Sequence, residues 1–190
     1  MFITIEGVDG SGKGTQSSKL AEWLETKTGR KTIRTAEPYV LRELILGNKN
    51  LCTLSDLLLF LADRAEHVDK VIAPALKANE NIICERYNDS TLAYQSAGQA
   101  LNIDHVKELI AACKFPEPDV KILLDIDPEI AFSRVLARNN HNDKFEAEGL
   151  RLITKVSDFY RANFTGIIIN CDGLDEAQVF KRITECVPFR

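Results

Sequence analysis

The sequence has no excess of positive charge. Its 190 residues include 24 Lys and Arg against 28 Asp and Glu, which gives a formal net charge of -4 at pH 7. Domains that bind DNA or RNA usually carry a basic excess, so we expect no nucleic-acid polymer as a partner. The hydrophobic content of 45% and the charged content of 27% match an ordinary globular protein.

Paired cysteines and long apolar runs are also missing. The five cysteines are widely spaced without a CxxC pair, which is typical of reduced, mostly buried thiols. No apolar run approaches membrane-spanning length, and Met1 leads directly into an apolar strand, which leaves no room for a signal peptide. We therefore expect a cytoplasmic protein with no membrane partner. Repeats, low-complexity stretches and linkers are absent as well, which predicts a single domain over residues 1–190.

What the sequence does contain, directly after the apolar residues 2–5, is the spacing of a phosphate-binding loop: a glycine, four residues, then Gly-Lys. Its glycines allow backbone conformations that turn several N–H groups toward one anion. These groups and the positive end of the following helix can hold phosphate oxygens, while Lys13 adds a full charge. The candidate residues are Gly7, Asp9, Gly10, Ser11, Gly12, Lys13, Gly14 and Thr15.

One position of this loop departs from the usual pattern. Gly14 replaces the Ser or Thr that normally follows the lysine, and Thr15 comes one residue later. We therefore expect a metal ion to be held partly through water or by Thr15. The alternative is a glycine-rich turn that binds nothing, which the strand before it, the helix after it and Lys13 disfavour.

Short apolar segments alternate with helical patterns along the whole chain. This alternation predicts an α/β layered fold with a parallel sheet. Strands are expected at about 2–6, 31–36, 81–84, 120–126 and 166–170, and helices at about 13–28, 53–78 with an interruption near Pro74, 90–96, 104–113, from 127–128 onward, 144–162 and 174–187.

Charged residues follow the second and third predicted strands. Glu37-Pro38 ends one strand and Glu85-Arg86 ends the other, at the sheet edge where α/β proteins place ligands. Glu85 could steer a hydrated metal ion, and Arg86 could hold a phosphate through two parallel hydrogen bonds. A structural ion pair between Glu85 and Arg86 is the alternative.

Two helical residues are further candidates. Phe60 and Arg64 are four residues apart and therefore lie on the same side of a predicted helix. A core phenylalanine and an arginine paired with a neighbouring acid are the alternative. His67 and His105 have no companion Cys or His at ligand spacing, so we assign them no role.

An asparagine-rich break at residues 139–143 separates two helical patterns. Arg138 precedes it and Lys144 follows it, which suits a mobile flap that brings positive charge to a phosphate. A solvated loop would have the same composition. We interpret His141 as a solvent-exposed loop residue rather than a base.

Together these segments resemble the thymidylate kinase family. The resemblance is carried by residues 5–13, 37–38, 59–64, 85–87 with 93–95, and 143–146, and it covers nearly the whole chain. It implies transfer of the γ-phosphoryl group of ATP to dTMP with Mg2+, giving dTDP and ADP for dTTP synthesis. It also implies a P-loop NTPase three-layer fold, in which helices flank a five-stranded parallel sheet, with a mobile lid at about 138–148, and a homodimer.

The resemblance also implies an acceptor site. Asp9 would contact the sugar 3′-hydroxyl, and Tyr94 would close against the deoxyribose and exclude a 2′-hydroxyl by its size. Phe60 would stack on thymine, Arg64 would hydrogen-bond its edge, and Arg86 would hold the acceptor phosphate. The set is completed by Glu37, Pro38 and Gln95.

Three departures from the family pattern concern Gly14, described above, Glu85 and Lys144. In addition, Gly10 stands where some members carry an arginine, so the resemblance implies that the lid supplies the catalytic cation. Arg138 and Lys144 are the candidates, with Arg134 as a third possibility. Glu85 replaces an aspartate and reaches one carbon further, and Lys144 replaces an arginine and so lacks its planar fork.

Two other functions compete with this one. An adenylate-kinase-like enzyme is suggested by Gly12 to Gln16, but Asp9 and the Phe60/Arg64 pair argue against it. A non-catalytic nucleotide-binding switch is the second alternative. It needs no clamp for an acceptor phosphate, so Arg86 and the basic lid disfavour it.

Overall fold

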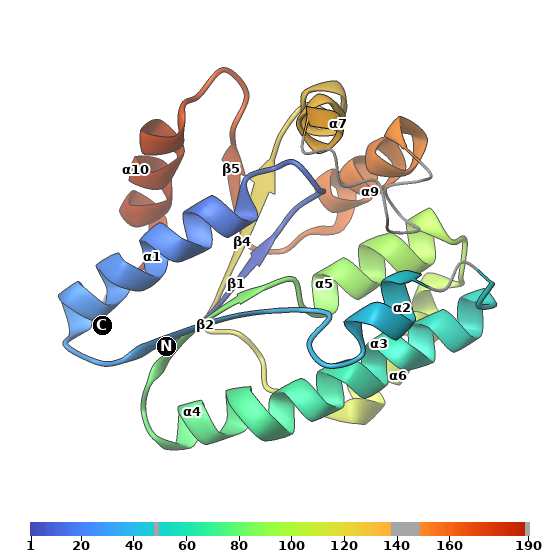
Figure 1. Cartoon of the computed structure of the whole chain (residues 1–190), viewed down its shortest axis with the longest axis horizontal. Helices are drawn as coiled ribbons and strands as arrows, with labels where there is room; N and C mark the ends of the chain where they lie inside the picture. Colours follow the sequence, from blue (N-terminus) through green and yellow to red (C-terminus); the bar gives the residue numbers. More distant parts are fainter. Residues whose placement is uncertain (48–49, 138–148, 189–190) are drawn as a thin grey trace.

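A computed structural model describes residues 1–47, 50–137 and 149–188. Five strands form one sheet in the order β2-β3-β1-β4-β5, and all neighbouring strands are parallel. The predicted five-stranded parallel α/β fold is confirmed, and Figure 1 shows helices on both sides of the sheet. The strands are β1 (Phe2–Glu6), β2 (Thr32–Ala36), β3 (Asn81–Glu85), β4 (Val120–Asp125) and β5 (Ile167–Asn170).

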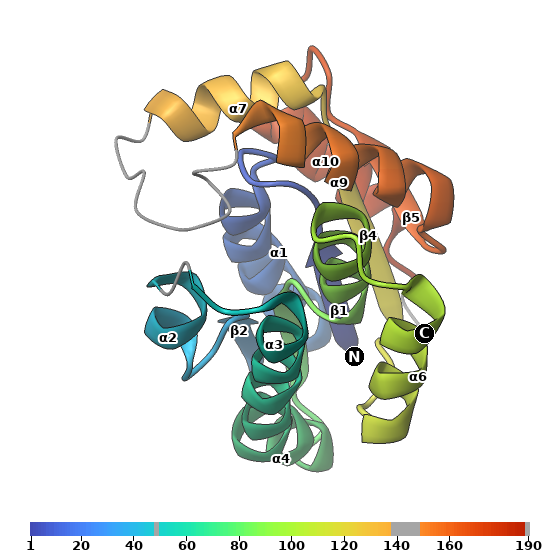
Figure 2. The same cartoon turned by 90° about the vertical axis from the view of Figure 1, so that its right-hand side faces the viewer.

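Helices cover both faces of this sheet. In Figure 1, α1 and α10 lie on one side, whereas α3, α4 and α9 lie on the other. Figure 2 shows α2 beside α3, and α7 with α9 at the opposite end of the molecule. The helices are α1 (Lys13–Thr28), α2 (Arg42–Gly47), α3 (Thr53–His67), α4 (Ala73–Lys77), α5 (Asn88–Thr91), α6 (Ile103–Cys113), α7 (Pro128–Ala137), α9 (Leu150–Asn163) and α10 (Glu176–Cys186), with π-helical turns η1 (Val68–Ile72) and η2 (Leu92–Gly98).

The strand at the centre of the sheet is buried along its whole length. All five residues of β1, Phe-Ile-Thr-Ile-Glu, are buried between β3 and β4. A parallel strand covered by helices on both faces loses the alternation of polar and apolar residues, so it reads as a short apolar run. This is why the sequence locates β1 so well, and with it the loop that follows.

The long helical stretch after residue 53 is continuous but irregular. The α3 helix runs into the π-turn η1 and then into α4, with Pro74 in the first turn of α4. Proline has no N–H to donate to the preceding turn, which fits the change from the π-turn η1 to α4 at this point. The prediction of one long helix with an interruption near Pro74 is confirmed.

One helical prediction needs correction, and another lies partly outside the described residues. Of the helix expected over about 144–162, the structure describes α9 from Leu150; Gly149 before it has φ 67° and ψ −153°, which is not a helical conformation, and residues 144–148 lie outside the described part of the chain. The final helix begins at Glu176 rather than at residue 174, because Asp175 caps it. The Asp175 side chain accepts from Gln178 N, and the Gln178 side chain accepts from Asp175 N. The short helix α2 was not expected from the sequence.

The carboxyl ends of all five strands meet at one edge of the sheet. Residues 7–12 follow β1, Glu37 follows β2, and Arg86 follows β3. A search of the described part of the chain found no helix with the length and apolar character that crossing a membrane requires.

Candidate active site

The glycine-rich loop wraps around the side chain of its own lysine. Lys13 Nζ donates to the carbonyl oxygens of Gly7 (2.9 Å) and Val8 (2.8 Å), and the side chain is buried. Burial, together with repulsion from Arg86, lowers the pKa of Lys13 to about 7. A phosphate would provide the negative charge that this buried ammonium needs.

Two loop glycines are required by close backbone contacts. A Cβ at Gly10 would lie 2.2 Å from the carbonyl oxygen of Ala131, and a Cβ at Gly7 would lie 2.8 Å from that of Leu124. Both residues also have positive φ, 87° and 142°, which glycine adopts without steric cost. An arginine at position 10 is therefore excluded by the packing of this loop against α7.

A pocket of about 660 Å³, including its open mouth, lies beside the loop. Arg134 from α7 reaches into it and donates to Gly10 O at 3.3 Å. The buried Ser11 Oγ and Gln16 Oε1 have no hydrogen-bond partner among the described residues. The pocket is lined by Gly10, Ser11, Gly12, Thr15, Gln16, Arg134, Cys171, Leu174, Asp175, Glu176 and Val179.

Asp9 and Arg86 join this loop to a second pocket. Arg86 Nη2 lies 2.6 Å from Asp9 Oδ1 and 3.3 Å from the Tyr94 hydroxyl, and Arg86 lies 4.9 Å from the centre of the Tyr94 ring. Burial alone would raise the pKa of Asp9, but the charges of Arg86 and Lys13 outweigh it and lower that pKa to about 2. Both partners are therefore charged at neutral pH.

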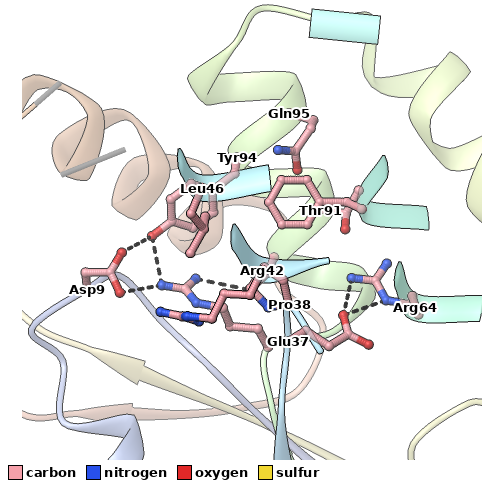
Figure 3. A pocket seen from close by; sticks show the side chains of 12 residues that line it. Asp9, Glu37, Pro38, Arg42, Leu46, Arg64, Thr91, Tyr94 and Gln95 are labelled. Atoms are coloured by element: carbon pink, nitrogen blue, oxygen red, sulfur yellow. Dashed lines mark hydrogen bonds and ion pairs between the residues drawn. The ribbon is translucent and has the colours of Figure 1, made fainter. Parts of the chain in front are cut away.

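The second pocket, of about 520 Å³ including its mouth, brings together eight residues expected from the sequence. It is drawn in Figure 3. Four further lining residues were not singled out from the sequence: Arg42, Leu46, Ser90 and Thr91. The eight expected residues are Asp9, Glu37, Pro38, Phe60, Arg64, Arg86, Tyr94 and Gln95.

Unpartnered polar atoms mark this second pocket as a polar binding site. Gln95 and Thr91 are 1% and 2% exposed, yet Gln95 Nε2 and Thr91 Oγ1 have no hydrogen-bond partner among the described residues. A buried polar group without a partner costs about 1–3 kcal/mol. A ligand with hydrogen-bonding edges would relieve that cost, whereas a purely apolar ligand would not.

Arg64 both pairs with an acid and lines the pocket, so the two readings of the sequence do not exclude each other. Its Nη2 lies 2.6 Å from Glu37 Oε2, and its Nη1 donates to Asn88 Oδ1 at 3.1 Å. The neighbouring Asp63 binds the segment after Pro38. Its carboxylate accepts from the backbone N–H groups of residues 39, 40 and 41 at 2.5–2.8 Å. These contacts attach the segment before α2 to α3.

Glu85 does not pair with Arg86, so the structural ion pair considered from the sequence is absent. Instead Glu85 Oε1 accepts from Ser17 Oγ (2.5 Å) and from Arg34 Nη2 (2.8 Å). Its second oxygen, Oε2, lies 3.6 Å from the place that a Cβ of Gly14 would take. Arg34 was not anticipated, because an arginine in a strand otherwise looks like a surface residue.

A fully buried glutamate, Glu6, accepts hydrogen bonds from the residues that follow Arg86. Glu6 Oε1 accepts from Tyr87 N at 2.8 Å, and Glu6 Oε2 accepts from Ser90 Oγ at 2.5 Å and from the Tyr160 hydroxyl at 3.0 Å. Burial, assisted by Asp89, raises the pKa of Glu6. The network anchors Tyr87, the residue directly after Arg86. Arg86 itself has a φ of 68°, which is unusual for a residue other than glycine.

The two preferred lid cations, Arg138 and Lys144, fall outside the described residues, as does His141. Arg134, the third candidate, lies in the first pocket as described above.

The parallel sheet, the glycine-rich loop after β1 and the paired pockets define a P-loop nucleotide-binding protein. A family model described as thymidylate kinase matches residues 5–182, and the chain belongs to the thymidylate kinase family. It is 42% identical over 174 residues to a thymidylate kinase of Prochlorococcus marinus (strain AS9601), covering 84% of this chain and 81% of that protein. A thymidylate kinase of Solidesulfovibrio magneticus is 42% identical over 177 residues, covering 85% and 84% of the two chains.

A solved structure agrees with these sequence relatives. The crystal structure of thymidylate kinase from Ehrlichia chaffeensis superposes with a TM-score of 0.75 at 31% identity and covers 97% of both chains. The similarity therefore extends across the sheet and both pockets rather than the glycine-rich loop alone.

Proposed function

We propose that this protein transfers the γ-phosphoryl group of ATP to dTMP, giving dTDP and ADP. The observation that carries the proposal is the position of the second pocket, which meets the phosphate loop at the Asp9–Arg86 pair. An acceptor phosphate held by Arg86 would thus face the donor phosphates held by the loop. A phosphate oxygen of dTMP would attack the γ-phosphorus as the bond to the ADP oxygen breaks.

Each end of the second pocket suits one part of a deoxynucleotide. Arg86 would hold the phosphate, Asp9 would accept from the 3′-hydroxyl, and the Tyr94 ring would pack against the deoxyribose. Phe60 would stack on the base, which contributes about 1–3 kcal/mol per base in comparable sites. Glu37 and Pro38 form the neighbouring wall.

The base edge is matched by three polar side chains of this pocket. Arg64 can donate to a thymine carbonyl but not to the amino group that cytosine carries in its place. The Gln95 amide, whose Nε2 has no partner among the described residues, offers both a donor and an acceptor for the N3–H edge, and Thr91 adds a hydroxyl. A pyrimidine with two carbonyl groups is therefore favoured over cytosine.

The chain's residues also fit a hydrated Mg2+ at the start of α1. Gly14 offers no hydroxyl, but Glu85 Oε2 faces it and Thr15 lines the adjoining pocket. Mg2+ usually keeps several waters and takes few protein ligands. Thr15 and Glu85 would hold it, directly or through water, and the ion would neutralise charge on the ATP phosphates.

Catalysis in phosphoryl transfer depends on alignment and on cations near the transferred group. Lys13 and the loop N–H groups of Gly7 to Thr15 would hold the donor. Because Gly10 leaves no room for a loop arginine, the last cation would come from the lid at about 138–148, as Arg138 or Lys144, or from Arg134. Such a cation is worth on the order of a thousandfold or more in rate.

An acceptor panel tests the reaction. We expect coupled-assay turnover with dTMP to exceed turnover with AMP, dCMP and UMP. Preference for AMP would indicate an adenylate-kinase-like enzyme. ATP binding without turnover on any acceptor would indicate a nucleotide-binding switch.

We also infer that the protein is cytoplasmic and forms a homodimer. All five cysteines are free thiols, as in reducing compartments. Leu54 and Leu58 on α3 are 53% and 48% exposed and offer an apolar face for a second copy. Sedimentation velocity of the wild type and of Leu58→Lys tests the dimer: a monomeric wild type would contradict it.

A further inference from the structure

A buried chain of polar side chains lies behind the second pocket. Glu37 stands between Arg64 and His67, and the three side chains are 3%, 2% and 0% exposed. Glu37 Oε2 accepts from Arg64 Nε at 2.8 Å, whereas Glu37 Oε1 lies 3.0 Å from His67 Nδ1. The other ring nitrogen, His67 Nε2, lies 2.7 Å from the Thr35 hydroxyl.

The hydrogen bonds define which ring nitrogen carries the proton. An ionised carboxylate can only accept, so His67 Nδ1 must donate to Glu37. The opposite ring nitrogen, Nε2, faces the Thr35 hydroxyl, so the imidazole is held from both sides. Tyr39 covers the imidazole, with ring centres 4.8 Å apart and planes 24° apart.

The same chain controls the position of the Arg64 guanidinium. Arg64 Nη2 donates to Tyr87 O at 3.0 Å, and the guanidinium lies over the rings of Tyr87 and Phe115 at 5.1 and 5.8 Å. In the part of the chain that the structure describes, Glu37 is the acid that pairs with Arg64. His67 fixes the other oxygen of that acid and so holds the plane of the carboxylate.

We propose that His67, with Thr35 behind it, is a positioning residue for the acceptor pocket. Its imidazole donates from Nδ1 to Glu37 and fixes that carboxylate, and Glu37 fixes Arg64 toward the base. This inference rests on the proposed function. It extends that function by assigning part of the base recognition to residues that do not line the pocket.

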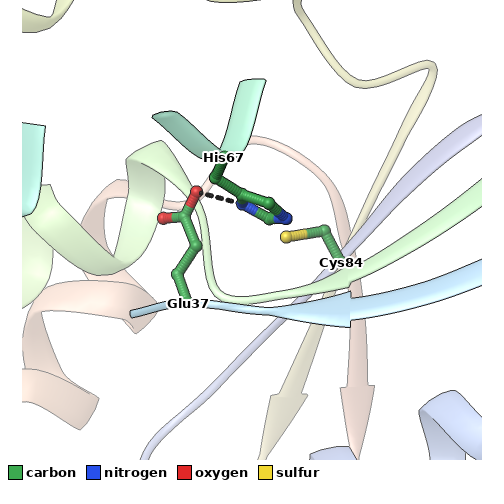
Figure 4. A group of neighbouring side chains, drawn as sticks. All are labelled: Glu37, His67 and Cys84. Carbon is green, nitrogen blue, oxygen red and sulfur yellow. Dashed lines mark hydrogen bonds and ion pairs between the residues drawn. The ribbon is translucent and has the colours of Figure 1, made fainter. Parts of the chain in front are cut away.

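A metal site is the competing interpretation of the same cluster. Glu37, His67 and Cys84 each offer one possible ligand atom, and these three atoms lie within 4.8 Å of one another (Figure 4). A cation there would have to displace either the His67 ring N–H from Glu37 Oε1 or the Arg64 guanidinium from Glu37 Oε2. It would also need a thiolate, yet burial and nearby carboxylates raise the pKa of Cys84 well above its ordinary value. The thiol instead donates to Arg86 O at 3.1 Å.

The test compares His67→Phe, which removes the donor, with His67→Asn, whose amide N–H can replace Nδ1–H. We expect His67→Phe to weaken dTMP binding on the order of tenfold, because hydrogen bonds to charged groups are stronger than neutral ones. ATP binding should change less than dTMP binding, and His67→Asn should recover most of the loss. Calorimetry gives both affinities, and thermal unfolding shows whether each variant is folded.

If His67→Phe does not fold, two further measurements decide the question. One compares Thr35→Val with its control, Thr35→Ser, and the other is nitrogen NMR of the wild-type imidazole. A spectrum with the hydrogen on Nε2 would overturn the proposal. So would unchanged dTMP affinity, or equal losses for dTMP and ATP, in His67→Phe or Thr35→Val. Stoichiometric Zn2+ binding that Cys84→Ser abolishes would show a metal site instead. If the wild type itself does not bind dTMP, the proposed function fails first.

Discussion

Arg86 and Asp9 form an ion pair of 2.6 Å between the residue after β3 and the loop after β1. The pair is one end of the second pocket and also part of the glycine-rich loop. Because Arg86 is paired with Asp9, the guanidinium is already oriented before a phosphate binds. A group held in advance loses less conformational entropy when the ligand binds.

Replacing Asp9 with Asn should destabilise the protein at neutral pH, because Arg86 loses its charged partner. The pKa of Asp9 is lowered from 3.8 to about 2, so the contribution is fully present above pH 3.8 and is lost as pH falls toward 2. Urea unfolding at several pH values should show the difference from wild type narrowing over that range. Asp69→Asn, at an exposed pair with Lys70, is the control. A difference independent of pH would contradict the assignment.

Gly10→Ala should destabilise the protein more than Gly12→Ala. Both residues have positive φ, 87° and 92°, and a side chain there costs about 1–2 kcal/mol. A Cβ at Gly10 additionally meets the Ala131 carbonyl at 2.2 Å, whereas a Cβ at Gly12 meets nothing within 4 Å. Urea unfolding of the two variants measures the difference directly. Equal losses would mean that the loop does not pack against α7 as described.

ATP affinity should fall as pH rises above neutrality. In the nucleotide-free protein the pKa of Lys13 is lowered to about 7, so the lysine loses its proton above that pH, whereas bound phosphates favour the charged form. Between about pH 7.5 and 9.5 the fall should approach tenfold per pH unit, and calorimetry in two buffers should detect proton uptake. In Lys13→Arg the charge persists, so its affinity should stay flat. A flat wild-type profile would contradict the prediction.

Lys144→Ala should reduce kcat more than it weakens nucleotide binding, because a cation on the transferred group acts in the transition state. The loss should be on the order of a thousandfold. Steady-state kinetics of Lys144→Ala, Arg138→Ala and Arg134→Ala side by side assigns the role. If Lys144→Ala retains full turnover, the arginine whose removal abolishes turnover is the one that acts.

The sheet and the glycine-rich loop could be predicted because their signals are local. The apolar residues of β1 are buried on both faces, and the spacing of Gly7, Gly12 and Lys13 is fixed by backbone geometry. Eight of the residues that line the second pocket were found because each lies in a segment that resembles the family. Four lining residues were missed: Ser90 and Thr91, and also Arg42 and Leu46, whose helix α2 is only six residues long and has no strong periodicity.

The supporting residues could not be predicted, because their meaning depends on partners far away in the sequence. His67 has no companion at metal-ligand spacing, yet it meets Glu37 thirty residues earlier. In the sequence Arg34 looks like an ordinary strand residue. Its partner Glu85 comes within reach only because β2 pairs with β3 in the sheet. The register of β2 against β3 creates the Arg34–Glu85 pair, and the packing of α3 beside the end of β2 creates the His67–Glu37 pair. No local pattern encodes either contact.

The three backbone hydrogen bonds to Asp63 have a mechanical consequence. They couple the segment that leads to Arg42 and Leu46 to the same helix that carries Phe60 and Arg64. A shift of α3 would therefore move these two groups of lining residues of the second pocket together. The wall of the pocket made by α2 and α3 would then move as one unit.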